Sequence, residues 1–259
     1  MASGGRATEP REAAHMTTHD IEAHLAELAT ACRLLALYGH TDLCSGHLTW
    51  RDPEGRGLWM KRAKVGLDEI TGPDDFVLID FDGNKLAGSG GRHNEWPIHT
   101  EIMRARPEIA CVGHTHAYHT QLFAATRDPL RPVAKEAAWF GDLPKFKQTC
   151  GHIKTPELGR ALAQTWGGAD GVLMISHGMA FCGRSIREAA LVGIYIEKSV
   201  KAQLDLAKTG LAYDWPTADD VAAKRATLRS ARGIEESWNY LVRLADRIGA
   251  GAGLAPLPA

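Results

Sequence analysis

The sequence lacks the features that would direct it to a membrane or to a nucleic acid. It has no apolar run long enough to cross a bilayer, and its first residues lack the apolar segment of a secretory signal. The formal net charge is only −1, which leaves no basic surface for nucleic acid or anionic lipid. We therefore expect a cytoplasmic protein without a membrane or nucleic-acid partner.

Cysteine is scarce and irregularly placed. The five cysteines stand at positions 32, 44, 111, 150 and 182, with wide spacings and no Cys-x-x-Cys pair. This odd number and these spacings argue against a disulfide framework and favour a reducing compartment. We expect each cysteine to be a small buried apolar side chain.

Length and patterning favour one folded domain. A chain of 259 residues can bury a sizeable core. Strand-like and helix-like segments alternate without a change in composition, which favours one α/β domain over two. We assign this domain to residues 17–248, and we expect a flexible arm at 1–16 and a disordered Gly/Pro/Ala-rich tail at 249–259.

Periodicity predicts the secondary structure. Apolar residues spaced three and four apart predict a helix over 18–38, with a threonine cap and with Gly39 at its end. Thr155 and Pro156 mark the start of another helix. The predicted helices are 18–38, 95–106, 117–125, 155–166, 185–208 and 217–248, the last as one helix. The predicted strands are 47–52, 58–61, two around an Asp-Gly turn within 74–88, and the buried runs 108–116 and 171–178.

The segment CVGHTHAYHT (111–120) places three of the twelve histidines within six residues. Residues two apart in a strand project to the same face, so His114 and His116 could supply two nitrogen ligands to one metal ion. Taken alone, such a pair is more often structural. His119 follows on the next turn, where it could lie beside the site or simply at the surface.

A third histidine shifts the balance towards a metal site. His177 ends the second buried strand, at the kind of position where α/β proteins build their sites. Three histidines leave an open coordination position, which is typical of a catalytic metal. Glu95 precedes the first histidine strand by one helix, and it could be a fourth ligand, a general base or only a helix cap.

Three segments in order resemble the class II aldolase/adducin family: SGHLTWRD (45–52), EWPIHTEIMRARPEIACVGHTH (95–116) and LMISHGMAFCGRS (173–185). The resemblance covers residues 20–210, and its middle segment is specific. It implies a single three-layer α/β/α domain around a central, mostly antiparallel sheet.

The resemblance also implies a set of site residues. It implies that His114, His116 and His177 bind a divalent metal and that Glu95 is the acid/base carboxylate. Members named for aldol cleavage use zinc, so we expect Zn²⁺, with Fe(II) or Mn(II) as alternatives. The small-molecule substrate would bind to this metal.

The resemblance further implies a homotetramer with active sites between subunits. Members of the family often bring an aromatic side chain into the site from a neighbouring subunit. Trp238 or Tyr240 could have this role, but helix packing or a subunit contact is the simpler role for both.

The sequence departs from the sugar-phosphate aldolases of the family where those enzymes cradle phosphate. They have Ser-Gly-Asn near the start, a Thr-Gly loop, and two serines before the glutamate. Here histidine occupies position 47, the loop is KRAKVG (61–66), and His93 and Asn94 precede Glu95. The small donors that let phosphate approach the backbone are largely gone.

We therefore predict a substrate without a phosphate group. His47, Lys64, Arg92 and His93 are the candidates for binding its carboxylate or phenolate, although the two cations could equally be ordinary surface charges.

Three functions stay open at this point. The first is a metal-dependent carbon–carbon lyase that acts by aldol cleavage or decarboxylation on a non-phosphorylated hydroxy or keto acid, including aromatic ones. The second is an iron(II)-dependent oxygenase of aromatic keto or hydroxy acids, which would use the same ligands. The third is a non-catalytic module like the head of adducin, and the complete ligand set argues against it.

Overall fold

An eight-stranded sheet runs through the computed structural model, which describes residues 17–248. Its strands are β1 (His47–Arg51), β2 (Leu58–Lys61), β3 (Phe76–Ile79), β4 (Lys85–Ala87), β5 (Cys111–Thr115), β6 (Lys145–Phe146), β7 (Gly171–Met174) and β8 (Gly178–Gly183). They lie in the order β4-β3-β2-β1-β5-β8-β7-β6. Every neighbouring pair is antiparallel except β6 and β7. The predicted arm at 1–16 and tail at 249–259 lie outside the described residues.

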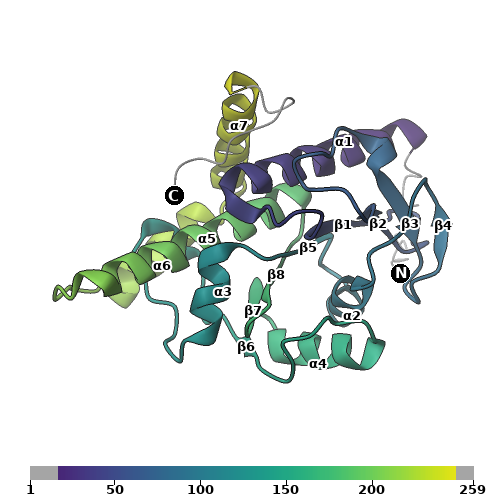
Figure 1. Ribbon diagram of the computed structural model, residues 1–259. Helices are drawn as coiled ribbons and strands as arrows, with labels where there is room; N and C mark the ends of the chain where they lie inside the picture. The colour runs from purple at the N-terminus through teal and green to yellow at the C-terminus, as the bar shows by residue number, and fades with distance from the viewer. Residues whose placement is uncertain (1–16, 249–259) are drawn as a thin grey trace, which may run out of the picture.

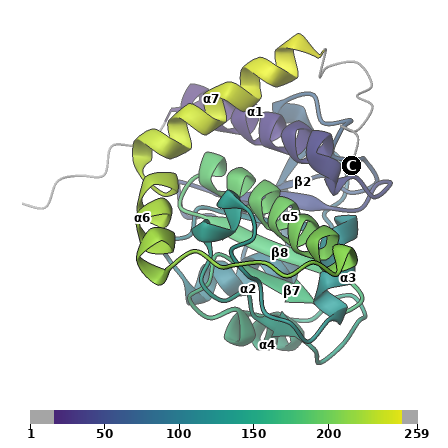
Figure 2. The same ribbon diagram turned by 90° about the vertical axis from the view of Figure 1, so that its left-hand side faces the viewer.

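Helices cover both faces of this sheet, as Figure 1 and Figure 2 show. One face carries α1 (Thr18–Leu35), α3 (Tyr118–Ala125), α5 (Ile186–Thr209) and α7 (Ala231–Arg247), and the other carries α2 (Trp96–Ala105) and α4 (Pro156–Trp166). A further helix, α6 (Ala218–Leu228), contacts α7 and the 3-10 turn Lys135–Trp139. The predicted three-layer α/β/α fold with a mostly antiparallel sheet is confirmed.

Two hydrophobic cores separate the layers, and β5 contributes to both. Cys111 belongs to the core under α1 and α5, whereas Val112 belongs to the core under α2 and α4. This alternation is the period of two that a strand imposes on its side chains. It continues along β5, so His114 projects from the same face as Val112, towards α2 and α4.

The helix starts follow the capping residues. Thr17 accepts a hydrogen bond from the backbone of Asp20, and the Asp20 carboxylate bonds back to Thr17, which forms a capping box. Thr155 caps α4, with Pro156 in its first turn as predicted. α1 continues into a π-helical turn, Ala36–His40, in which Gly39 has a φ of +84°. The helix predicted over 18–38 is therefore confirmed, with this distortion at its end.

The prediction of one helix over 217–248 was wrong. The chain forms α6 and α7 with a break at Arg229 and Ser230. Ser230 accepts a hydrogen bond from the backbone of Gly233 and so starts α7 as a new helix. Arg229 meanwhile binds the carboxylate of Asp170.

The predicted extent of the second buried strand, 171–178, was also wrong. β7 ends at Met174, and the chain turns through Ser176, whose φ is +50°, before β8 begins at Gly178. His177 therefore lies in a hairpin turn rather than at the end of one long strand. Neither β8 nor the short strand β6 was predicted.

Two of the cysteines also differ from the expectation. Cys32, Cys111 and Cys182 are buried, but Cys44 and Cys150 are exposed, and all five are free thiols. Among helices in the described part of the chain, none is long and apolar enough to cross a membrane.

Candidate metal centre and active site

Four side chains from three distant segments meet beside the end of β5. Glu95 directly precedes α2, His114 lies on β5, His116 follows that strand, and His177 lies in the turn between β7 and β8. One nitrogen or carboxylate oxygen from each of them lies within 4.8 Å of the others. The side chains are buried except for that of His116, which is half-buried. The structure thus brings together the three predicted metal ligands and the predicted acid/base residue.

Local backbone features allow this close approach. Thr115 projects to the opposite face from its two histidine neighbours, where its hydroxyl lies 2.8 Å from Nδ1 of His40. A Cβ atom at Gly178 would lie 2.3 Å from the carbonyl oxygen of Thr115 and 2.9 Å from the ring of His116. Only glycine therefore lets the turn that carries His177 pack against the end of β5.

Hydrogen bonds orient two of the imidazoles. Nδ1 of His114 lies 2.9 Å from the carbonyl oxygen of Met179, and Nδ1 of His116 lies 2.7 Å from Oδ2 of Asp42. A carbonyl and a carboxylate only accept hydrogen bonds, so both Nδ1 atoms carry the hydrogen. In the neutral rings, Nε2 therefore bears the lone pair, which is the form that binds a metal.

The arrangement of these lone pairs fits a cation. The two Nε2 atoms of His114 and His116 are 3.0 Å apart, but neither carries a hydrogen to donate in this tautomer. A divalent cation between them would replace this repulsion with two bonds. His177 completes the set with a ring centroid 5.0 Å from that of His114 and 5.1 Å from that of His116. The donor set of three imidazoles and one carboxylate suits Zn²⁺, Fe(II) or Mn(II).

The carboxylate of Glu95 faces this cluster. Its Oε1 accepts a hydrogen bond from the backbone N–H of Ile153 at 2.8 Å and lies 3.5 Å from Nε2 of His177, and its Oε2 lies 3.7 Å from Nε2 of His114. It makes no cap hydrogen bond to α2, so the simple capping role is wrong. Burial alone would raise the pKa of Glu95, but the hydrogen bonds from His177 and from the Ile153 N–H outweigh it and hold the pKa well below its usual range. Glu95 is therefore ionised.

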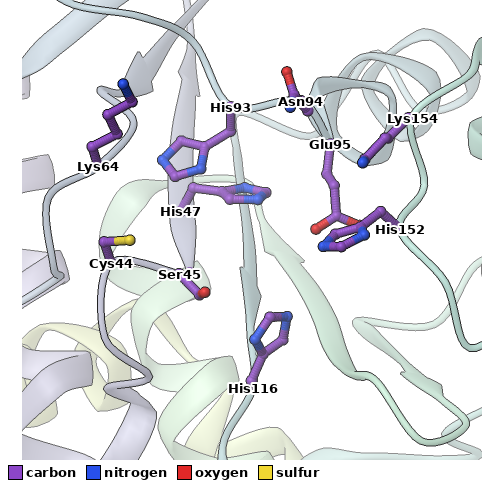
Figure 3. Close-up of a pocket in the computed structure, with 11 residues that line it drawn as sticks. Cys44, Ser45, His47, Lys64, His93, Asn94, Glu95, His116, His152 and Lys154 are labelled. Atoms are coloured by element: carbon purple, nitrogen blue, oxygen red, sulfur yellow. The ribbon is translucent and has the colours of Figure 1, made fainter.

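A cavity of about 200 Å³ opens next to the cluster (Figure 3). Its lining residues are Cys44, Ser45, Gly46, His47, Lys64, His93, Asn94, Glu95, His116, His152 and Lys154. Three predicted substrate-binding residues, His47, Lys64 and His93, are among them. Lys64 and Lys154 stand on opposite sides of the view in Figure 3 and bring positive charge to the pocket.

Arg92 does not line this cavity, contrary to the prediction. Its guanidinium donates hydrogen bonds to the carbonyl oxygens of Gly83, at 2.5 Å, and of its neighbour His93. It also lies over the ring of Trp96, 5.5 Å from the centroid. These contacts hold the turn before α2 and occupy the side chain that we expected to bind substrate.

Sequence patterns missed several residues of the site. Asp42 precedes β1 and orients His116, and His152 and Lys154 reach the pocket from the loop before α4. These residues lie in loops without periodicity. Only the local density of titratable residues in TDLCSGH (41–47) and GHIK (151–154) could have drawn attention to them.

The three residues with undecided roles lie outside the pocket. Nδ1 of His119 is 2.8 Å from the carboxylate of Glu197. Trp238 is buried in the core beneath α7 and lies against Arg187. Tyr240 is exposed and lines a separate cavity beside α5.

Replacing Asp42 with alanine is expected to weaken metal binding by about 10- to 100-fold, because His116 loses the acceptor that orients its ring. Competition of the protein with a chromogenic chelator would measure this affinity. Asp42→Asn keeps an oxygen acceptor and serves as the matched control. Equal affinities in the wild type and in Asp42→Ala would contradict the orienting role.

The comparisons with known proteins agree with the fold. The profile of the Class II Aldolase and Adducin N-terminal domain matches residues 26–204. A crystal structure of an aldolase II superfamily protein from Pseudomonas syringae superposes with a TM-score of 0.79 at 24% identity, over 91% of this chain and 96% of that one.

Two curated relatives carry named activities. The 3,4-dihydroxyphthalate decarboxylase of Arthrobacter keyseri is 28% identical over 82% of this chain and 90% of its own length. The 4-hydroxy-3-prenylphenylpyruvate oxygenase/4-hydroxy-3-prenylbenzoate synthase of Streptomyces roseochromogenus subsp. oscitans is 30% identical over 62% of this chain and 60% of its own length. The chain therefore belongs to the class II aldolase and adducin N-terminal domain family.

Proposed function

We propose that the protein is a divalent-metal-dependent carbon–carbon lyase that acts on a non-phosphorylated hydroxy or keto acid by decarboxylation or aldol cleavage. One observation carries this proposal: the lone pairs of His114 and His116 converge at 3.0 Å beside an ionised carboxylate and an open cavity. Three imidazoles bind the metal and the cavity admits a substrate, which is the composition of a catalytic rather than a structural site.

The residues divide the work of such a reaction. His114, His116 and His177 would hold a divalent cation, which would supply Lewis-acid stabilisation of the negative charge that bond cleavage leaves on a substrate oxygen. Glu95 starts as a carboxylate, so its first step is to accept a proton, from a substrate hydroxyl. The same proton is then close enough to be returned to the carbon that has lost its substituent.

The pocket favours an acid without a phosphate group. Lys64 and Lys154 supply charge from flexible side chains on the rim, and His93 and Asn94 stand where sugar-phosphate aldolases have serines. Burial lowers the pKa of His93 to about 4, so this ring is neutral and the two lysines are the cations that meet a carboxylate. Similarity to a decarboxylase of a dihydroxylated aromatic acid makes hydroxylated aromatic acids the first class to test.

An iron(II) oxygenase is the second candidate. The same histidines and carboxylate can hold Fe(II), and one relative is named as an oxygenase. Dependence on dioxygen separates the two reactions, because a lyase of this kind consumes none. A non-catalytic module would need no open metal site beside a substrate-sized cavity.

The deciding experiment starts from protein purified without chelator and without oxygen. We would measure its metal content and then its release of CO₂ or of a carbonyl product from a panel of hydroxy and keto acids. Release under anaerobic conditions, lost on chelation, supports the lyase. Product formation only with Fe(II) and dioxygen would support the oxygenase, and failure to bind any divalent metal would overturn both.

We further propose a homotetramer with sites between subunits, on the basis of the family alone. Light scattering of the purified protein would test the assembly. A monomer with full activity would show that one chain completes the site.

A further inference from the structure

The ring of His47 lines the pocket and lies beside the cluster formed by Glu95, His114, His116 and His177. His47 is paired with His114 across the β1–β5 ladder, and their ring centroids are 5.2 Å apart. The side chain lines the cavity, where Figure 3 shows its ring beside that of His93. Histidine at this position is also where the chain departs from the Ser-Gly-Asn sequence of sugar-phosphate aldolases.

A chain of hydrogen bonds leads from His47 into the core, away from the pocket. Nδ1 of His47 lies 2.6 Å from Nε2 of His99, and Nδ1 of His99 lies 2.8 Å from the hydroxyl of Thr49. The Thr49 hydroxyl in turn donates to the carbonyl oxygen of Val112 at 3.3 Å. The side chains of His47, His99 and Thr49, which form this series of hydrogen bonds, are all buried.

The carbonyl at the end of the chain sets its direction. The carbonyl oxygen of Val112 can only accept a hydrogen bond, so the Thr49 hydroxyl donates its hydrogen to that oxygen. The Thr49 oxygen then accepts the hydrogen of Nδ1 of His99. Nε2 of a neutral His99 is then an acceptor, and it must receive the hydrogen of Nδ1 of His47. Burial lowers the pKa of His99 to about 3, in keeping with the neutral ring that this chain requires.

The remaining nitrogen of His47 therefore bears a lone pair. Within residues 17–248, Nε2 of His47 has no hydrogen-bond partner. It is also not one of the fully buried, unpaired polar side-chain atoms of the core. The neighbouring His93 does not satisfy it through its own Nε2, because that nitrogen lies 3.3 Å from the carbonyl oxygen of Arg62 and donates there. This nitrogen acceptor therefore faces the pocket, beside the cluster of Glu95 and the three histidines.

We propose that His47 is a hydrogen-bond acceptor that selects substrates carrying a hydroxyl group, with His99 and Thr49 as positioning residues that fix its tautomer. This inference rests on the proposed function, since it assumes that the pocket holds the substrate. It replaces the expectation that His47 binds a carboxylate or phenolate, because a lone pair repels an anionic oxygen. A phenolic or alcoholic O–H supplies the hydrogen that the ring lacks.

The tautomer can be measured without any substrate. We would record ¹H–¹⁵N correlations of Zn²⁺-loaded protein labelled with ¹⁵N-histidine, and assign the signals of His47 by their loss in His47→Phe. We expect a hydrogen on Nδ1 and none on Nε2 at neutral pH. A hydrogen on Nε2, or a doubly protonated ring, would overturn the proposal.

Selectivity is measured with defined probes. Binding of 3,4-dihydroxybenzoate and of its two mono-O-methyl ethers to Zn²⁺-loaded protein would be compared by calorimetry. Loss of one neutral hydrogen bond corresponds to about a 10-fold change in affinity. We expect one ether to bind about 10-fold more weakly than the diol, and His47→Phe to remove this difference. Lys64→Met, the control, should weaken all three probes alike and preserve it.

The positioning role has a rescue test. His99→Leu removes the acceptor for Nδ1 of His47 and should reduce the preference for the hydroxyl, whereas His99→Gln offers an amide oxygen and should retain it. An unchanged preference in His99→Leu would contradict the positioning role. If no probe binds, the proposed substrate class is wrong, and the tautomer still decides the role of His47.

Discussion

Replacing Glu95 with glutamine is expected to lower kcat by about 100- to 10,000-fold while the metal content stays near that of the wild type. Glutamine has the shape of the carboxylate and can still accept the hydrogen bond from Ile153 N–H through its amide oxygen. It cannot take up a proton. The three imidazoles proposed to hold the metal are unchanged, so loss of turnover with retained metal would identify Glu95 as the acid/base.

The matched control is Glu101→Gln. Glu101 lies on α2, is also buried, and pairs with Arg104 and Arg160 away from the cluster. Its replacement removes a buried carboxylate from the helix that Glu95 precedes, without changing a residue of the cluster. We expect kcat of this variant to stay within a few-fold of the wild type. If Glu95→Gln behaved like this control, Glu95 would not be the acid/base, and a fall in metal content would make it chiefly a ligand.

The second large effect is expected for His114→Ala, which should lose most of its bound metal. His114 is fully buried and contributes the lone pair at the centre of the cluster. A metal that binds only the folded state stabilises it by about 2.7 kcal/mol at a free concentration 100-fold above Kd. We therefore expect Zn²⁺ to raise the Tm of the wild type and to leave the Tm of His114→Ala nearly unchanged.

This measurement compares each variant with and without EDTA, because removing a buried ring also costs stability by itself. His119→Ala is the matched control. His119 lies five residues further on and contacts Glu197 rather than the cluster. It should keep the full Zn²⁺-dependent rise in Tm. An equal rise in His114→Ala would mean that His114 is not a ligand.

Much of the fold could be predicted because periodicity and local signals agree over long segments. The threonine cap of α1 and the proline after Thr155 each mark a boundary that the structure has. The failures occur where local signals are short. Ser230 interrupts a stretch whose composition suits a helix on both sides. The four-residue strand β7 is followed by a single further apolar residue, Ile175, before its turn.

The site could be predicted where its residues stand on regular elements. His114 lies on β5 and His116 directly follows the strand, so their spacing of two residues gives them a common face. The order of the three family segments adds Glu95 and His177. Loop residues carry no such constraint, so the contribution of Lys154 and the departure of Arg92 depended on tertiary packing. Contacts between residues far apart in the chain depend on the folded sheet and cannot be predicted from local sequence patterns.

The division between strand and loop has a consequence for how this protein can change during evolution. The nitrogen at the centre of the cluster stands on β5, in the middle of the sheet, whereas Lys64, His152 and Lys154 stand on surface loops around the pocket. Mutations in these loops disturb few packed neighbours, so they can accumulate with little loss of stability. A lineage could therefore acquire a new substrate by altering these loops alone, while the residues proposed to bind the metal stay unchanged.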